Sequence, residues 1–288
     1  MLSRWNDTEA QSFIEAAEAK GQPAALGLRV YASRLIGQEP DLVLHGGGNT
    51  SVKIMDAEGG PLIHVKGSGW DLGDIEAPGL PAMYLEPLLK TRDIPHMSDE
   101  DMVALLRANL LDPSAPTPSI EALLHAYMPH NFVDHTHATA SLALADQSDM
   151  EPVMREIYGD RVAFVPYVMP GYSLSQACND ALKQNSDVEG LWLAQHGLFT
   201  FADTARGSYE LMIEFVTMAE DYLAANGAQV QPPQTNDRDA PEALTEALRE
   251  ALAAEGSLGE APCLDFRSTP SIRTYLAREN LEVLAQRG

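Results

Sequence analysis

The segment Asn131-Phe-Val-Asp-His-Thr-His137 carries the pattern that decides the fold of this 288-residue chain. Its apolar and β-branched residues predict a strand, on which His135 and His137 stand two positions apart. Side chains at i and i+2 of a strand point to the same face, about 7 Å apart at the backbone. The pair is therefore a candidate for binding one metal ion. The alternative for the pair alone is a strand that faces a polar cleft with two satisfied histidines.

His196 supplies a third imidazole. It follows the apolar run Gly190-Leu-Trp-Leu-Ala-Gln195, which is typical of a short buried strand, and it directly precedes Gly197. At such a strand end the backbone can bend sharply and turn an imidazole into a pocket. Taken singly, a histidine of this kind is more often structural. Combined with His135 and His137, it predicts the three protein ligands of an open catalytic zinc site, with one position left for substrate.

Glu121 is the fourth candidate for this site. The sequence predicts a helix over 119–127, because proline and serine precede it and Pro129 follows it. This helix comes directly before the 131–137 strand, so a tight connection would bring the Glu121 carboxylate over the metal. Alternatively, Glu121 is a solvated charge stabilised by the helix dipole. His125, one turn further on, is predicted to be structural and to pack or hydrogen-bond beside Glu121.

Two glycine-rich turns are candidates for binding an anion. The first, His45-Gly-Gly-Gly-Asn-Thr-Ser51, offers unhindered backbone N–H groups, and it is not a Walker loop because no Gly-Lys-Ser/Thr follows. A plain hairpin turn is the alternative. The second, Lys66-Gly-Ser-Gly-Trp-Asp-Leu-Gly73, lacks the helix that a dinucleotide fingerprint requires, because glycines and prolines interrupt residues 71–81. It predicts a second anion-binding turn with Lys66 and Ser68 available.

Outside these motifs, the chain alternates helical and strand patterns in a way typical of an α/β domain over 1–225. Helices are expected over 8–37, split at Gly21 and Pro23, and over 98–111, 119–127, 150–158, 173–185 and 204–225, and strands over 41–44, 51–54, 62–66, 131–137, 162–168 and 190–195. Residues 226–262 contain four prolines and a thin leucine stripe, which predicts an acidic linker with one surface helix. A helical segment over 271–285 is expected within the C-terminal residues 263–288.

The charge balance excludes one class of partner. The chain has 19 basic and 42 acidic residues, a net charge of −23, which would repel nucleic acid and disfavours an anionic membrane surface. Two cysteines are too few for a disulfide framework, and the sequence has neither a signal-peptide pattern nor a run of about 20 apolar residues. We therefore expect a soluble cytoplasmic protein.

Taken in order, five motifs resemble those of the class II aldolase/adducin family, over roughly residues 25–225. The motifs are Gly46-Gly-Gly-Asn-Thr-Ser51, Lys66-Gly-Ser-Gly69, Pro118-Ser-Ile-Glu121, His135-Thr-His137 and Gln195-His-Gly-Leu198. The chain looks closest to the aldolase portion of fused aldolase/short-chain dehydrogenase proteins, without a dehydrogenase half. It also resembles rhamnulose-phosphate and fuculose-phosphate aldolases.

The resemblance implies a three-layer α/β/α sandwich around a central, mostly antiparallel sheet. It implies a divalent ion, Zn²⁺ or another such as Mn²⁺ or Co²⁺, held by His135, His137 and His196. Glu121 matches the acidic residue that serves as the catalytic base, and a fourth metal ligand is a second role open to it.

The resemblance also implies a pocket for a substrate phosphate. The positions that match it are Gly48, Asn49, Ser68, Gly69 and Ser119, with Lys66 as a nearby cation. The chain departs from the family pattern in two places. Ile120 replaces the second serine of the usual Ser-Ser-Glu, which removes one hydroxyl donor, and the segment between Glu121 and His135 is shorter than in the sugar-phosphate aldolases.

The activity implied by the resemblance is cleavage of a ketose 1-phosphate, through a metal-stabilised enediolate, to a dihydroxyacetone-phosphate-like ketone and an aldehyde. A pentulose-phosphate 4-epimerase, with Tyr167 or Tyr172 as a further acid/base group, and a phosphorylated keto-acid decarboxylase are alternatives on the same fold. A non-catalytic adducin-like interaction module is a third, although adducin heads generally lack the full ligand set. The expected partners are a small sugar phosphate and further copies of the chain in a homotetramer.

Overall fold

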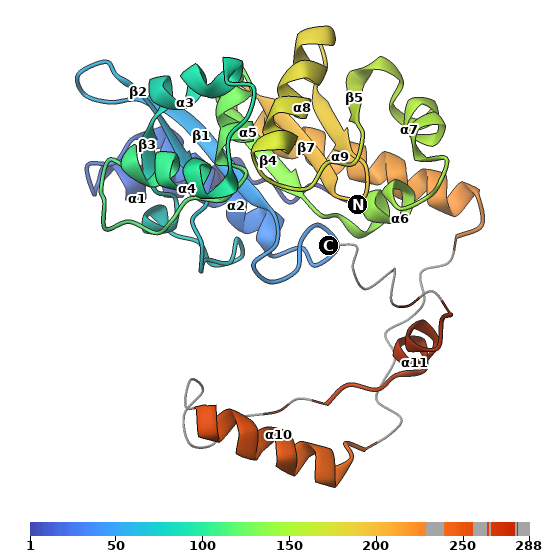
Figure 1. Ribbon diagram of the computed structural model, residues 1–288. Coiled ribbons are helices and arrows are strands. Elements are labelled where there is room, and N and C mark those ends of the chain that lie inside the picture. The colour runs from blue at the N-terminus through green and yellow to red at the C-terminus, as the bar shows by residue number, and fades with distance from the viewer. Residues whose placement is uncertain (229–238, 256–263, 265, 280, 282–288) are drawn as a thin grey trace. The chain divides into compact units, whose positions relative to one another are not determined.

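The computed structural model describes residues 1–228, 239–255, 264, 266–279 and 281. The chain divides into two compact units, Met1–Ala228 and Gln229–Gly288. Every residue that the sequence assigns to the candidate site lies in the first unit, whose helices and strands are shown in Figure 1.

A single seven-stranded sheet forms the centre of the first unit, in the order β3-β2-β1-β4-β7-β6-β5. Every neighbouring pair is antiparallel except β5 and β6, which run parallel. The strands are β1 Asn49–Met55, β2 Pro61–Val65, β3 Ala82–Tyr84, β4 Phe132–Thr136, β5 Val162–Val165, β6 Gly190–Leu193 and β7 Gly197–Ala202. The predicted mostly antiparallel sheet is confirmed.

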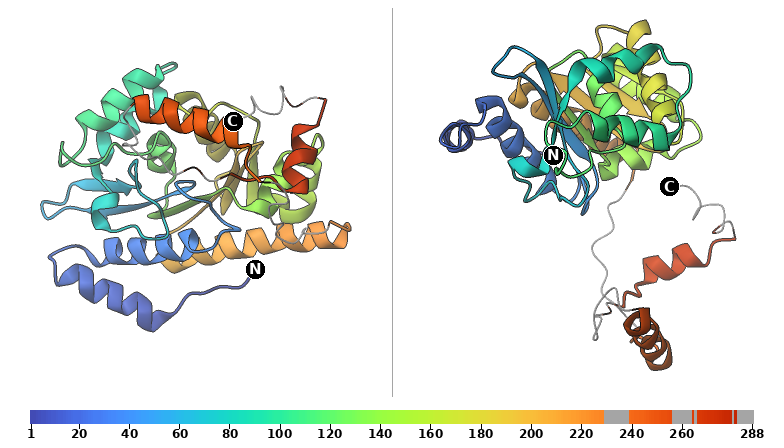
Figure 2. Two further views of the ribbon diagram at one scale, coloured as in Figure 1. Left: turned by 90° about the horizontal axis from the view of Figure 1, so that it is seen from below. Right: turned by 60° about the vertical axis from the view of Figure 1, so that its left-hand side comes forward.

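Helices cover both faces of this sheet. The helices of the first unit are α1 Asp7–Glu18, α2 Ala24–Gly37, α3 Leu85–Leu89, α4 Asp99–Ala108, α5 Ala122–Tyr127, α6 Thr139–Ala145, α7 Met150–Tyr158, α8 Tyr172–Gln184 and α9 Ala205–Ala225. Helices α2 and α9 lie side by side on one face, with α1 outside α2 (Figure 2). Helices α3, α5 and α8 pack on the opposite face, so the predicted α/β/α layering is confirmed.

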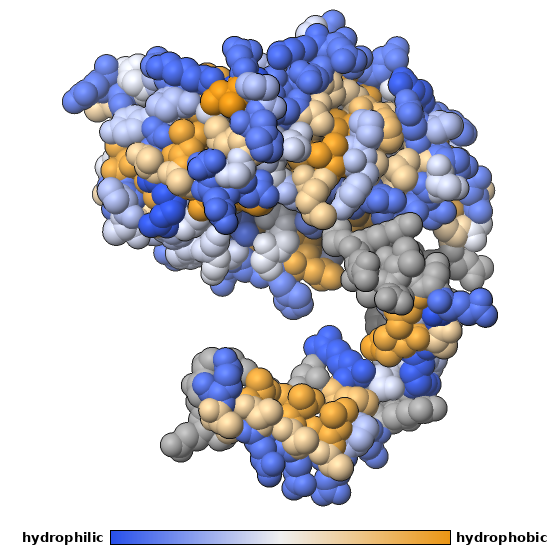
Figure 3. Space-filling view, viewed as in Figure 1, coloured by the Kyte–Doolittle hydropathy of each residue, from blue (hydrophilic) through white to orange (hydrophobic). Residues whose placement is uncertain are grey.

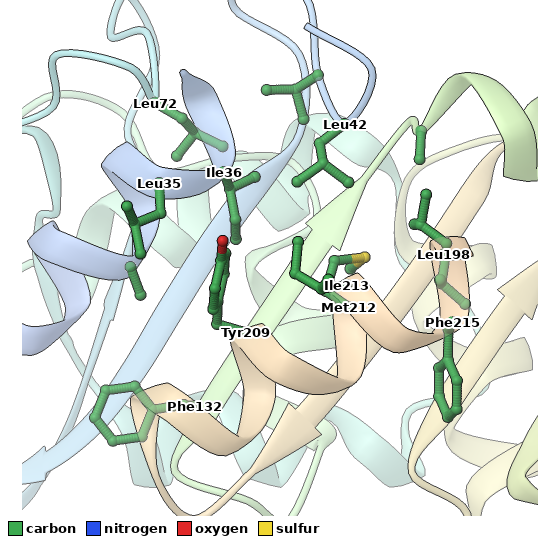
Figure 4. Close-up of a cluster of buried hydrophobic side chains, with 14 of the residues drawn as sticks. Leu35, Ile36, Leu42, Leu72, Phe132, Leu198, Tyr209, Met212, Ile213 and Phe215 are labelled. Atoms are coloured by element: carbon green, nitrogen blue, oxygen red, sulfur yellow. The ribbon is translucent and has the colours of Figure 1, made fainter. Parts of the chain in front are cut away.

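The core between the sheet and the α2/α9 face follows the two-residue alternation of the strands. Phe132 of β4 and Leu198 of β7 meet Ile36 of α2 and Tyr209 and Phe215 of α9 (Figure 4). Alternation then sends Val133 and His135 to the other face, where Val133 packs in a separate apolar cluster with residues of α8. The candidate site is therefore on the α5/α8 side of the sheet.

A buried ion pair joins α2 to the sheet beneath the site. Arg29 Nη2 lies 2.6 Å from Asp134 Oδ1, and neither side chain is exposed. The other carboxylate oxygen of Asp134 accepts a hydrogen bond of 2.6 Å from Ser208 of α9. Because an unpaired charge would be costly here, Arg29 and Asp134 depend on each other and hold α2, α9 and β4 together.

One expected strand is not formed, and two observed strands were not expected. Residues 41–44, predicted as a strand, form turns and irregular backbone: the N–H groups of Leu42 and Val43 donate to Glu39 O. Leu42 and Val43 enter the core without a neighbouring strand, while Leu44 is exposed, which is why the pattern misleads. The two unexpected strands are β3 and β7: the strand predicted over 190–195 ends before Gly197, whereas the structure pairs Gly197 with Leu193 at the start of β7.

The second unit contains two helices among its described residues, α10 Glu242–Glu255 and α11 Pro270–Leu276. On α10, Leu244 and Leu248 are 54% and 46% exposed, and apolar side chains gather along this helix in Figure 3. The helix predicted over 271–285 ends at Leu276, and most of its remaining length lies outside the described residues. Within the described part of the chain, no helix is long and apolar enough to cross a membrane.

Candidate metal centre and substrate pocket

The candidate site lies at one edge of the sheet, where several strand ends meet. The antiparallel register sets Asn49, the first residue of β1, beside His135 near the end of β4. His137 follows the last residue of β4, and His196 occupies the turn between β6 and β7. Lys66 directly follows β2 at the same edge. Sequence motifs far apart in the chain are thus brought together by strand pairing.

The structure brings the three predicted histidines together. One ligand atom from each of His135, His137 and His196 lies within 4.8 Å of the others. The Nε2 atoms of His135 and His137 are 3.0 Å apart, and the rings of His137 and His196 have centroids 5.2 Å apart. His135 is fully buried, while the other two retain partial exposure.

Glu121 closes the group from the start of α5, where it occupies the N-cap position. Its Oε1 lies 3.3 Å from His196 Nε2, and its Oε2 lies 3.6 Å from His135 Nε2. Within the described part of the chain, Oε1 is buried without a hydrogen-bond partner. Three clustered imidazoles, with the buried Glu121 carboxylate beside two of them, form a donor set that suits a divalent cation.

The protonation states also fit a metal. His135 Nδ1 donates to Leu198 O at 3.1 Å, which leaves Nε2 unprotonated and directed at the other ligands in the neutral ring. Burial is the main cause that lowers the pKa of His135, His137 and His196, and the lowering is strongest for His135. Neutral imidazole is the form that binds a metal ion, so the three rings are ready to do so at neutral pH.

Two glycines allow the ligand strands to approach closely. Gly48 has φ +64°, and a Cβ atom there would lie 2.7 Å from His135 O. A Cβ atom at Gly197 would lie 2.4 Å from Thr136 O and 3.1 Å from His135 Cε1. A larger residue at either position would displace β4, so both glycines are required for the position of His135.

A cavity of about 700 Å³ opens beside the histidines. All six predicted phosphate-pocket residues line it: Gly48, Asn49, Lys66, Ser68, Gly69 and Ser119. Trp70 and Asp71 also line the cavity, although no motif in the sequence gives them a role. Both residues directly follow Gly69 in the same glycine-rich turn, and this position is the sequence signal that could have placed them in the pocket. Ile120, which replaces a serine of the family pattern, lines the cavity as well.

Backbone N–H groups in both turns already have hydrogen-bond partners within the protein. The N–H groups of Gly67 and Ser68 donate to Gly79 O and Thr117 O, both at 2.8 Å, and Gly47 N–H donates to Leu44 O. These amides are therefore engaged within the protein. Lys66 Nζ donates to Gly46 O at 3.0 Å and so connects the two turns. Burial lowers the pKa of Lys66, and Asp71 and Glu121 oppose that shift.

The two tyrosines considered as a further acid/base group, Tyr167 and Tyr172, lie in different surroundings. The hydroxyl of Tyr172 is buried and lies 2.7 Å from Thr91 O and 2.6 Å from Ile94 O, so it is engaged away from the histidines. Tyr167 is 42% exposed and follows β5, at the same edge of the sheet as the histidines. Of the two, only Tyr167 could act as a further acid or base.

Comparison with known proteins agrees with this architecture. The family model for the class II aldolase and adducin N-terminal domain matches residues 28–223. A curated relative from Bacillus subtilis, an uncharacterized oxidoreductase called YuxG, is 35% identical over 216 residues, which is 73% of this chain and 31% of the relative. The chain thus spans about a third of the length of that relative.

Solved structures show the same fold. The N-terminal class II aldolase domain of a conserved protein from Thermoplasma acidophilum is 38% identical, with a TM-score of 0.65 over 69% of this chain and 93% of that one. YgbL from Klebsiella pneumoniae, described as a putative aldolase/epimerase/decarboxylase, is 17% identical, with a TM-score of 0.53 over 77% and 93% of the two chains. The chain belongs to the class II aldolase and adducin family, as its motifs predict.

Proposed function

We propose that this protein is a divalent-metal-dependent aldolase that cleaves a ketose 1-phosphate, or a related sugar phosphate, to a dihydroxyacetone-phosphate-like ketone and an aldehyde. The observation that carries the proposal is the convergence of three neutral imidazoles with the buried carboxylate of Glu121 beside a cavity of about 700 Å³. Family membership supports a lyase-type enzyme. A cytoplasmic location and a homotetramer belong to the same proposal and rest on composition and resemblance.

His135, His137 and His196 would hold the metal, with Zn²⁺, Mn²⁺ and Co²⁺ as candidates. When bound, the ion would stabilise the negative charge that develops on the substrate oxygens as the carbon–carbon bond breaks. The protein's own contribution is to keep the three rings neutral by burial and to direct the His135 ring through the bond from its Nδ1 to Leu198 O.

Glu121 would move the proton. In cleavage, the C4 hydroxyl would pass its proton to the Glu121 carboxylate and become the aldehyde, and the electron pair of the C3–C4 bond would stay with the ketone fragment. Protonated Glu121 would deliver a proton to C3, and in the reverse direction its carboxylate would remove one. Burial raises the pKa of Glu121 in spite of His196, Asn49 and Lys66, which favours a group that can carry a proton near neutral pH.

The substrate phosphate would bind in the cavity, between the turns that contain Gly48 and Gly69. Lys66 would supply positive charge, and Ser68 and Ser119 would supply hydroxyl donors. Asn49 also lines the cavity, although its amide nitrogen already donates to Glu121 and Ser119. Local groups of this kind would attract an anion in spite of the net charge of −23.

A product panel decides between this reaction and its alternatives. Purified protein incubated with fuculose 1-phosphate, rhamnulose 1-phosphate, ribulose 5-phosphate and a phosphorylated keto acid would be analysed for aldehyde, epimer and carbon dioxide. We expect dihydroxyacetone phosphate and an aldehyde from a ketose 1-phosphate. Epimer or carbon dioxide would favour the epimerase or decarboxylase, and no turnover with any member would favour the adducin-like module.

The role of Glu121 makes a separate prediction. Dihydroxyacetone phosphate in D₂O should exchange a C3 proton for deuterium, because the carboxylate removes and returns it. Glu121→Gln should slow this exchange by roughly 10² to 10⁴-fold, as expected for loss of a general acid/base. Proton NMR measures the exchange. Glu100→Gln, at an exposed glutamate in the first turn of α4, is the matched control and should exchange at the wild-type rate. Full exchange by Glu121→Gln would remove this glutamate from the mechanism.

A further inference from the structure

The proposed reaction gives no role to the side chain of His125, which is buried beside the site and bonds to Asn49. It lies on α5, one turn after Glu121, and is fully buried. Its Nε2 bonds to Asn49 Oδ1, and its Nδ1 lies 2.8 Å from Ser51 Oγ. The ring therefore connects α5 to the first and third residues of β1.

The hydrogen bonds of Asn49 fix the direction of its amide. Asn49 Nδ2 donates to Glu121 Oε2 at 2.5 Å and to Ser119 Oγ at 3.2 Å. A carboxylate can only accept, so the NH₂ group of Asn49 must face Glu121. The carbonyl oxygen Oδ1 then faces His125, and Nε2–H of His125 must be the donor to it.

This arrangement also requires His125 to be neutral, with Nδ1 as the acceptor from the Ser51 hydroxyl. Burial holds the pKa of His125 well below its ordinary value, and Lys53 and Arg29 add to the lowering. The ring is packed edge-on against Phe199 of β7, with centroids 5.5 Å apart. Hydrogen bonds at both ring nitrogens and packing against Phe199 thus hold the imidazole in one orientation.

We propose that His125 is a positioning residue for Glu121 and acts through Asn49. By donating Nε2–H to Asn49 Oδ1, it keeps the amide from turning over and so keeps Nδ2 directed at Glu121 Oε2. The other carboxylate oxygen, Oε1, is then left without a hydrogen bond, 3.3 Å from His196 Nε2, on a residue that lines the cavity. This inference rests on the proposed proton transfer by Glu121.

A matched pair of substitutions isolates the donor atom. The amide nitrogen of glutamine can take the place of Nε2, whereas the shorter asparagine reaches only the place of Nδ1. His125→Gln should therefore exchange dihydroxyacetone phosphate within a few-fold of the wild type. His125→Asn should be slower by roughly 10- to 100-fold in kcat, the usual effect of losing an outer hydrogen-bond partner, with little change in KM.

Two further measurements separate positioning from a merely structural effect. First, zinc content per chain should be unchanged in both variants, because His125 does not contact the three ligands. Second, His125→Asn should cause no additional loss in an Asn49→Ala background, because the path to Glu121 is already broken. His64→Gln is the control for loss of a histidine elsewhere on the sheet, since His64 bonds to Leu80 O and does not line the cavity.

Several results would overturn the inference. These are equal exchange rates for His125→Gln and His125→Asn, an additive loss in the Asn49→Ala background, and loss of zinc together with exchange. If His125→Asn does not fold, His125→Phe, which lacks the donor and keeps an aromatic ring against Phe199, should show the same loss of kcat. If the wild type itself exchanges no proton, the proposed function fails first, and the two failures are thereby distinguished.

Discussion

At the scale of single residues, the sequence identifies the candidate metal ligands and the candidate base but not their hydrogen-bond partners. His135, His137, His196 and Glu121 are found from motif and spacing, and the structure brings all four together. The contact between Asn49 and Glu121 could not be predicted, because it depends on the register that pairs Asn49 with His135. Nothing in a linear pattern fixes that register.

Lys53 illustrates the same limit and supports a prediction on stability. It lies on β1, and its Nζ donates to Met128 O and His130 O just beyond the end of α5. Burial, with a smaller effect of Arg92, lowers the pKa of Lys53 to about 7. Between pH 7 and its unfolded pKa, this lysine is protonated in the unfolded chain and largely neutral in the folded one, so the unfolded chain binds more protons.

Stability should therefore rise with pH over this range. The free energy of unfolding of the wild type, relative to Lys53→Met, should increase by about 1 kcal/mol per pH unit between pH 7.5 and 9.5. Urea unfolding at a series of pH values measures the difference. A difference that is flat, or that falls with pH, would show that Lys53 keeps its proton in the folded protein.

At the scale of helices and strands, the role of Gly197 was the hardest feature to predict from the sequence. The strand predicted over 190–195 ends before Gly197, yet Gly197 begins β7 and passes close to His135 and His137. A methyl group there would lie 2.4 Å from Thr136 O and 3.2 Å from His137 Cδ2. A close approach between two strands needs tertiary contacts and is not encoded in local periodicity.

Gly197→Ala tests this account of β7. Because the backbone of β4 must move to accept the methyl group, we expect a loss of about 1–3 kcal/mol in the free energy of unfolding and a lower zinc content. Gly46→Ala is the control, since no atom lies within 4 Å of a Cβ built there. Chemical denaturation and metal analysis give both readouts. An alanine variant as stable and as metal-rich as the wild type would contradict the requirement for glycine.

At the scale of the whole molecule, the family and the layering follow from the sequence because five motifs occur in a fixed order. The arrangement of strands is harder to predict, since 41–44 has the composition of a strand but forms turns and irregular backbone, from which Leu42 and Val43 are buried in the core. The net charge of −23 disfavours polyanionic partners. It is compatible with a small anionic substrate, because Lys66 and a metal ion would supply positive charge within the cavity.

The division of the chain gives a prediction at this scale. All candidate site residues lie within Met1–Ala228. A chain that ends at Ala228 should therefore fold, retain its metal and exchange dihydroxyacetone phosphate at a rate close to that of the full chain. Far-UV circular dichroism, metal analysis and the NMR exchange assay would be compared for the two lengths. Loss of metal or exchange on truncation would show that the second unit contributes to the site.

The central claim is that His135, His137 and His196 form a metal centre, and metal analysis of the purified chain tests it most directly. We predict about one divalent ion per chain for the wild type and for the control His64→Gln. We predict far less than one ion for His135→Ala and for His196→Ala, because two imidazoles and a carboxylate bind more weakly. Wild-type protein without stoichiometric metal after incubation with Zn²⁺, Mn²⁺ and Co²⁺, or histidine variants that keep a full equivalent, would contradict the account.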